Sequence, residues 1–195
     1  MAKFFGNLNL VLLTGLVFAV IVMFRYAGAS EGMLPVDANS VLRWLHVFFG
    51  ILWIGLLYYL NFVQVPTMPS VPAELKAGVT GYIAPKVLFY FRYGALFTVL
   101  TGLCIAIVKG YAHRAMTFNG ATAAENLIGL GMWLALIMAF NVWFIIWPAP
   151  QKILGLVEAT AEEKAAVGPR ALYASRTNVL LSLPMLYCMV SANLG

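Results

Sequence analysis

Charged side chains are scarce in this sequence: Asp, Glu, Lys and Arg make up 10% of its 195 residues, against roughly a quarter in ordinary soluble domains. Neither a soluble globular domain nor a disordered chain can present so few charges to water. No stretch of the chain is both polar enough and long enough to build a large catalytic domain outside a membrane. The composition therefore excludes these three classes of protein.

Cysteine and histidine are also rare, with two of each. Cys104 and Cys188 are far apart and form no CxxC pair, no zinc-ligand spacing and no CxxCH haem-attachment motif. Both lie in apolar runs, where free thiols act as small hydrophobic side chains. The sequence therefore predicts neither a zinc site nor covalently attached haem c in this chain.

Apolar residues are abundant instead, at 63% of the chain, and the mean hydropathy is +0.90. A membrane-spanning helix needs about 20 apolar residues, and the sequence has room for five. The predicted helices cover residues 8–24, 41–65, 87–108, 126–147 and 171–190. Pro66 and Pro148 are expected to end the second and fourth helices, and Pro184 to kink the fifth. We predict a single membrane domain over residues 1–195, an all-α bundle embedded in a lipid bilayer.

The connecting segments are short. Four prolines within residues 66–85 predict an irregular loop, and residues 159–166 are typical of a short helix with acidic residues near its start. With an inside N-terminus, the inner segments carry seven Lys and Arg and the outer segments carry four. This bias favours an N-in, C-out topology. We assign the net charge of +5 to topology and expect no nucleic-acid partner.

The two histidines fall on one side of this topology. His46 lies in the first turns of the second predicted helix, and His113 follows the end of the third. Two imidazoles on neighbouring helices at one depth are able to ligate a haem b between them. Arg43 is placed to pair with a haem propionate. Gly50, one turn beyond His46, would let a flat macrocycle approach the helix.

Other interpretations of these residues stay open. His46 would equally serve as a hydrogen-bonding residue across the bundle, and His113 as part of a basic cluster at the membrane interface. If His113 is not a ligand, Met132 or Met189 would take that place, and a His/Met pair raises the potential of a haem relative to a His/His pair. Methionines also fill cores.

Five polar side chains lie inside the predicted spans, in the half opposite the histidines: Asn61, Gln64, Arg92, Asn141 and Asn178. An arginine surrounded by amides suits an anionic, amide-rich small molecule. The same residues would also form a structural hydrogen-bond network, because polar groups in lipid must find partners. Both readings stay open at this point, although the arginine is the most costly to bury.

Four segments resemble the membrane-bound urate hydroxylase family, also called the urate oxidase N-terminal domain family. They are residues 43–66 (RWLHVFFGILWIGLLYYLNFVQVP), 89–95 (FYFRYGA), 141–152 (NVWFIIWPAPQK) and 174–185 (ASRTNVLLSLPM). The resemblance implies a redox protein of the bacterial cytoplasmic (inner) membrane that converts urate to 5-hydroxyisourate. Family members with the full architecture carry a C-terminal cytochrome c domain and are thought to pass electrons to it.

Because these 195 residues contain no CxxCH, we expect electrons to pass to a separate periplasmic cytochrome c. The leading hypothesis is a b-type haem electron-transfer subunit, with His46 as iron ligand and urate near Arg92. The alternative is a haem-free accessory subunit of a larger respiratory or monooxygenase complex. A small transporter is a third hypothesis, which rests on Pro184 alone.

Overall fold

The computed structural model describes residues 2–26, 37–153 and 157–192. Over these ranges the chain forms helices joined by short turns, and none of the described residues lies in a strand. The all-α prediction is therefore confirmed. The chain divides into two compact units, residues 1–42 and residues 43–195, and each is described by itself.

The first unit contains α1 (Ala2–Phe5), α2 (Leu8–Tyr26) and the start of α3 (Ala38–Tyr58). Its apolar stretch Leu8–Phe24 coincides with the first predicted span. Asp37 caps α3, because its Oδ1 accepts a 2.8 Å hydrogen bond from the Ser40 N–H and its Oδ2 accepts another from the Ser40 hydroxyl. These bonds favour the ionised carboxylate and lower the pKa of Asp37.

The second unit, which begins at Arg43 within α3, is built mainly from long helical stretches. Three of them are long and apolar enough to cross a membrane: Ala38–Ser70, Ala73–Val108 and Ala123–Ile153. They contain, in order, α3, η1 (Tyr59–Gln64), α4 (Val65–Thr67), η2 (Met68–Ser70), α5 (Ala73–Gly78), η3 (Val79–Ile83), α6 (Ala84–Val108), α8 (Ala123–Phe140), η4 (Asn141–Ile146) and α9 (Pro148–Ile153). The short α7 (Ala112–Met116) precedes α8, and α10 (Ala161–Ser191) ends the described chain. The protein is thus a helical membrane protein by composition, and the number of five spans stays a prediction.

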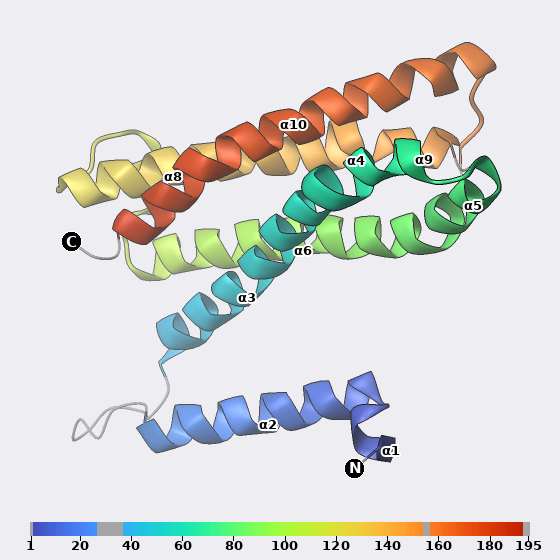
Figure 1. Cartoon of the computed structure of the whole chain (residues 1–195). Coiled ribbons are helices and arrows are strands. Elements are labelled where there is room, and N and C mark those ends of the chain that lie inside the picture. The colour runs from blue at the N-terminus through green and yellow to red at the C-terminus, as the bar shows by residue number, and fades with distance from the viewer. Residues whose placement is uncertain (1, 27–36, 154–156, 193–195) are drawn as a thin grey trace. The chain divides into compact units, whose positions relative to one another are not determined.

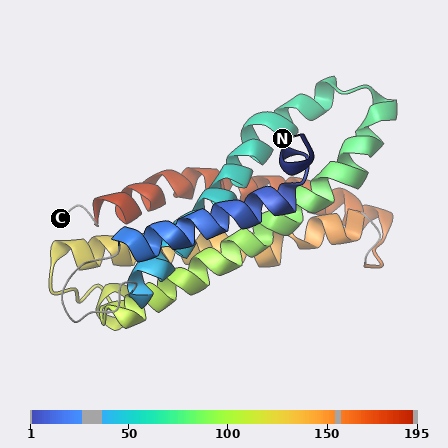
Figure 2. The ribbon, with the colours of Figure 1, turned by 90° about the horizontal axis from the view of Figure 1, so that it is seen from below.

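Helices α8 and α10 run side by side, whereas α3 runs obliquely to α6 (Figures 1 and 2). At the crossing of α3 with α6, a Cβ on Gly94 would lie 3.2 Å from the backbone nitrogen of Trp53. Glycine therefore lets the two backbones approach closely. Trp53, Leu57 and Phe91 are fully buried there and form the centre of the main apolar core.

The prediction that Pro66 and Pro148 end their helices is wrong. Each of the π-helical segments η1, η3 and η4 ends two residues before a proline, at Pro66, Pro85 and Pro148. A proline lacks an N–H, and its ring clashes with the carbonyl four residues earlier. The wider π turn changes the hydrogen-bond register just before the proline, so that Trp147 donates to the Val142 carbonyl at 3.0 Å. The helical path therefore continues through both prolines.

The segment from 66 to 85 is also more regular than predicted. It is helical except at Val71 and Pro72, whose extended backbone angles separate one long helical stretch from the next. The short helix expected at 159–166 is in fact the start of α10, where the Thr160 hydroxyl accepts a 3.2 Å bond from the Glu163 N–H. The fifth predicted helix accordingly begins ten residues earlier, at Ala161, and continues through Pro184.

Candidate functional site

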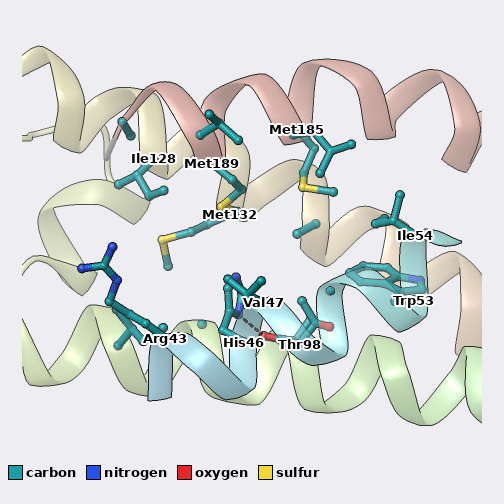
Figure 3. A pocket seen from close by; sticks show the side chains of 18 of the residues that line it. Arg43, His46, Val47, Trp53, Ile54, Thr98, Ile128, Met132, Met185 and Met189 are labelled. Carbon is teal, nitrogen blue, oxygen red and sulfur yellow. Dashed lines mark hydrogen bonds between the residues drawn. The ribbon is translucent and has the colours of Figure 1, made fainter. Parts of the chain in front are cut away.

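A cavity of about 700 Å³ lies inside the second unit, between α3, α6, α8 and α10 (Figure 3). Its volume falls within the range of cofactor and ligand sites, about 300–1,000 Å³. Most of its wall is apolar, and the lining side chains include Val47, Ile54, Leu103, Ile128, Met132, Met185 and Met189. Such a wall excludes water and leaves orientation to a few polar groups.

His46 is the polar group best placed to act on this cavity. Its half-buried imidazole lines the wall, and its Nδ1 lies 2.9 Å from the Thr98 carbonyl oxygen and 3.2 Å from the Thr101 hydroxyl. Because a carbonyl only accepts, Nδ1 of the neutral ring carries the hydrogen and Nε2 keeps its lone pair. The same arrangement orients histidines that bind metals.

Gly102 on α6 is required for this position of the ring. A Cβ at Gly102 would lie 2.8 Å from Cε1 of His46 and 3.2 Å from its Nδ1, which is too close without displacement. By contrast, a Cβ at Gly50 would meet nothing closer than the Thr98 methyl group, at 3.9 Å. Gly50 lines the cavity, as does Gly102. The imidazole is therefore cradled against the α6 backbone.

Two cations, Arg43 and Lys109, also line the cavity, and both are exposed. Neither takes part in an ion pair within the described ranges. The nearby carboxylate of Glu125 is engaged by Arg114 in a two-pronged contact, with N–O distances of 2.7 and 2.9 Å. Burial raises the pKa of Tyr111, so its phenol stays neutral. This end of the cavity is therefore suited to anionic groups of a ligand.

The wall opposite His46 carries three thioethers. Met132 comes from α8, whereas Met185 and Met189 come from α10, and Figure 3 shows their side chains across the cavity from His46. Thioether sulfur is a soft ligand for iron in haem proteins. His113 is not part of this arrangement, because it is exposed on α7 and does not line the cavity. The structure therefore brings His46, Arg43 and Gly50 together and leaves His113 outside.

The amides predicted to bind substrate do not line this cavity. Asn141 donates from Nδ2 to Oδ1 of Asn178 at 2.9 Å, and Asn178 donates in turn to the Met138 carbonyl at 2.9 Å. Asn61 donates from its Nδ2 to the Leu57 carbonyl at 2.9 Å and to the Ser175 hydroxyl at 2.7 Å. These bonds tie η1 and η4 to α10, so the amides hold the bundle together.

Arg92 lies in an aromatic cluster. Its guanidinium carbon is 3.2 Å from the centroid of the Trp147 ring, and it also faces the rings of Trp143 and Tyr93 at 5.5 and 5.6 Å. Arg92 is half-buried, and its Nε has no hydrogen-bond partner among the described residues, nor does Oε1 of Gln64. Cation–π contacts partly replace water around the charge, and hydrogen-bonding atoms of both side chains remain unused.

The family assignment follows from a sequence comparison. The family model described as Urate oxidase N-terminal matches residues 97–195, half of the chain. The chain belongs to this family. Two of the segments that suggested it, 141–152 and 174–185, lie inside the match, whereas 43–66 and 89–95 precede it. No curated protein and no solved structure matches the chain.

Membership in the urate oxidase N-terminal family links the protein to urate oxidation. The matched half supplies the cavity wall made by the end of α6, by α8 and by α10, including Gly102, Lys109 and Met132. The α3 wall with His46 lies before it. Within the described ranges, no group of three or more His, Cys, Asp or Glu side chains is placed to hold a metal ion. A haem iron requires only axial ligands from the protein.

Proposed function

We propose that this protein is a b-type haem electron-transfer protein of the bacterial cytoplasmic membrane that acts in the oxidation of urate to 5-hydroxyisourate. The observation that carries the proposal is the fixed orientation of His46, whose Nδ1 donates to the Thr98 carbonyl at 2.9 Å in the wall of a large apolar cavity. Family membership supports the link to urate oxidation.

The residues present fit a haem. Nε2 of His46 would hold the iron, and the Thr98 carbonyl and Gly102 would keep the ring in place. Arg43 and Lys109 would pair with the propionates. Apolar side chains around the cavity would exclude water and disfavour charge, which tunes the potential. When bound, the haem supplies one-electron chemistry. The acceptor in this proposal is a periplasmic cytochrome c.

Arg92 is the first candidate for contact with urate. Its guanidinium keeps hydrogen-bonding capacity, and Gln64 and Asn61 each keep a buried side-chain oxygen without a partner in the described part of the chain. A planar anion with amide groups needs a cation together with acceptors of this kind. Asn141 and Asn178 spend their bonds on each other and on Met138, so their role in the proposal is to position η4.

A haem-free accessory subunit is the second candidate, and one observation favours it. The hydrogen bond from His46 to Thr98 joins α3 to α6, which is also what a purely structural histidine would do. On this reading the cavity would take a lipid chain or a partner helix. The two candidates differ in whether Nε2 of His46 binds iron.

Visible spectroscopy separates them. The protein is expressed in haem-replete cells, purified in mild detergent and measured in oxidised and dithionite-reduced forms, as wild type, His46→Ala and His113→Ala. We expect a sharp b-type α-band in the wild type and in His113→Ala, and its loss in His46→Ala. A correctly folded wild type with a featureless spectrum would contradict the proposal and favour the accessory subunit.

A further inference from the structure

The three thioethers across the cavity from His46 differ in what surrounds them. Met185 belongs to the main apolar core, together with Trp53 and Leu57. Met189 packs against α8, since a Cβ at Gly131 would lie 3.2 Å from its Cε and 3.6 Å from its Sδ. Both side chains thus have a clear part in helix packing.

Met132 has a different position. It belongs to a smaller cluster with Ala106 and Ala115, and the partly buried Leu103 and Ile128 that pack on this cluster also line the cavity. In Figure 3 its side chain extends from α8 into the cavity, toward the wall that carries Arg43 and His46. Of the three thioethers that line the cavity, Met132 comes from α8, whereas the other two come from α10.

The backbone beside Met132 is held firmly. A Cβ at Gly131 would lie 2.9 Å from the Cβ of Cys188 on α10, and one at Gly129 would overlap the Ala115 carbonyl oxygen on α7. These contacts hold α8 close to α10 and α7 at positions one and three residues before Met132. Rigid backbone support of this kind is what a ligand side chain needs in order to keep its geometry.

We propose that Sδ of Met132 is the second axial ligand of the haem, opposite Nε2 of His46. This inference rests on the proposed function, and it assigns the place that His113, exposed on α7, does not reach in the structure. A His/Met pair raises the reduction potential relative to a His/His pair. The site is therefore built to accept electrons readily and to pass them to an acceptor of still higher potential.

The test compares Met132→Leu with the matched controls Met185→Leu and Met189→Leu, each purified with haem from haem-replete cells. Met132→Leu is expected to keep its haem through His46 and to lose the near-infrared sulfur-to-iron band of the ferric protein. Its midpoint potential falls, and its ferrous form gains carbon monoxide binding. Both controls are expected to keep the near-infrared band and the midpoint potential of the wild type, and their ferrous forms should not bind carbon monoxide.

Met132→His provides a second test that does not depend on removing a ligand. It is expected to give a two-histidine spectrum and a midpoint potential below that of the wild type. Retention of the band in Met132→Leu, or its loss in either control instead, overturns the assignment and leaves haem binding intact. A wild type without haem overturns the proposed function itself, and the ligand assignment with it.

Discussion

The two ends of the second unit use polar groups in opposite ways. Around Asn141 and Asn178, amide hydrogens are spent on the amide and carbonyl oxygens of neighbouring helices. Around His46, one ring nitrogen is anchored to Thr98 and the other is left beside a cavity of about 700 Å³. A closed network stabilises, whereas an anchored group with one unused atom is equipped to bind a ligand.

The largest expected effect is the loss of stability when the hydrogen bonds between Asn141 and Asn178 are removed. Asn178→Leu removes a fully buried amide and leaves Nδ2 of Asn141 without its acceptor. The Met138 carbonyl loses the bond from Asn178 but keeps the one from the backbone N–H of Asn141. The unsatisfied amide costs about 1–3 kcal/mol and the lost bond to Met138 about 0.5–1.5 kcal/mol, so the free energy of unfolding in detergent should fall by about 2–4 kcal/mol. Tyr173→Phe, on an exposed side chain of α10, is the control. An unchanged stability would show that the network is not what joins α8 to α10.

The next largest effect is expected on haem affinity at the His46 end of the cavity. Gly102→Ala places a methyl group against Cε1 of His46 and turns the ring. Disturbing the support of a metal-binding histidine typically costs about 10–100-fold in affinity, and we expect a loss of this size in haem titrations of the apoprotein. Gly78→Ala, where a Cβ meets nothing within 4 Å, should bind haem normally. Equal haem affinities in the two variants would mean that the close contact between Gly102 and the His46 ring does not contribute to haem binding.

The residues around His46 also show which parts of a site can be predicted from the sequence. Arg43, His46 and Gly50 lie at three- and four-residue spacing on one helix, so their common face is readable without a structure. Gly102 and Thr98 escaped notice because their role arises where α3 passes α6, which hydropathy does not predict. The signal was present, since Gly94, Thr98, Thr101 and Gly102 form a stripe of small residues on α6.

The prolines illustrate a second limit. Pro66 and Pro148 are strong helix breakers in water-soluble proteins, and the predicted ends at 65 and 147 followed from that rule. The preceding π turns η1 and η4 absorb the missing hydrogen bond. Sequence analysis assumes the α-helical period of 3.6 residues, which does not include π turns. For this reason the continuation of these helices was not predictable, and neither was the contact of Asn61 and Asn141 with α10.

Arg92→Leu tests whether urate binds at Arg92. Loss of charge-assisted hydrogen bonds, worth about 1.5–3 kcal/mol, should weaken urate binding about tenfold or more in equilibrium dialysis. The haem spectrum should not change, because Arg92 does not line the cavity. Asn126→Ala, in the first turn of α8, is the comparison variant. Unaltered urate binding would remove Arg92 from the substrate site and leave the haem site untouched.

The smallest effect is expected at Arg43 and Lys109, which are exposed and therefore screened by salt. The double variant Arg43→Gln, Lys109→Gln should weaken haem binding by a few-fold at low ionic strength and less at high salt. Haem titrations at two salt concentrations measure it. An identical affinity at both concentrations and in both proteins would mean that the propionates lie elsewhere.

The central claim is that His46 binds the haem iron and that His113 does not. The chain contains only two histidines, so pulsed electron paramagnetic resonance of the ferric protein labelled with ¹⁵N-histidine tests it directly. The account predicts strong coupling to nitrogen of a single histidine, absent in His46→Ala and unchanged in His113→Ala. Coupling to two histidines, or coupling that survives in His46→Ala, would contradict it.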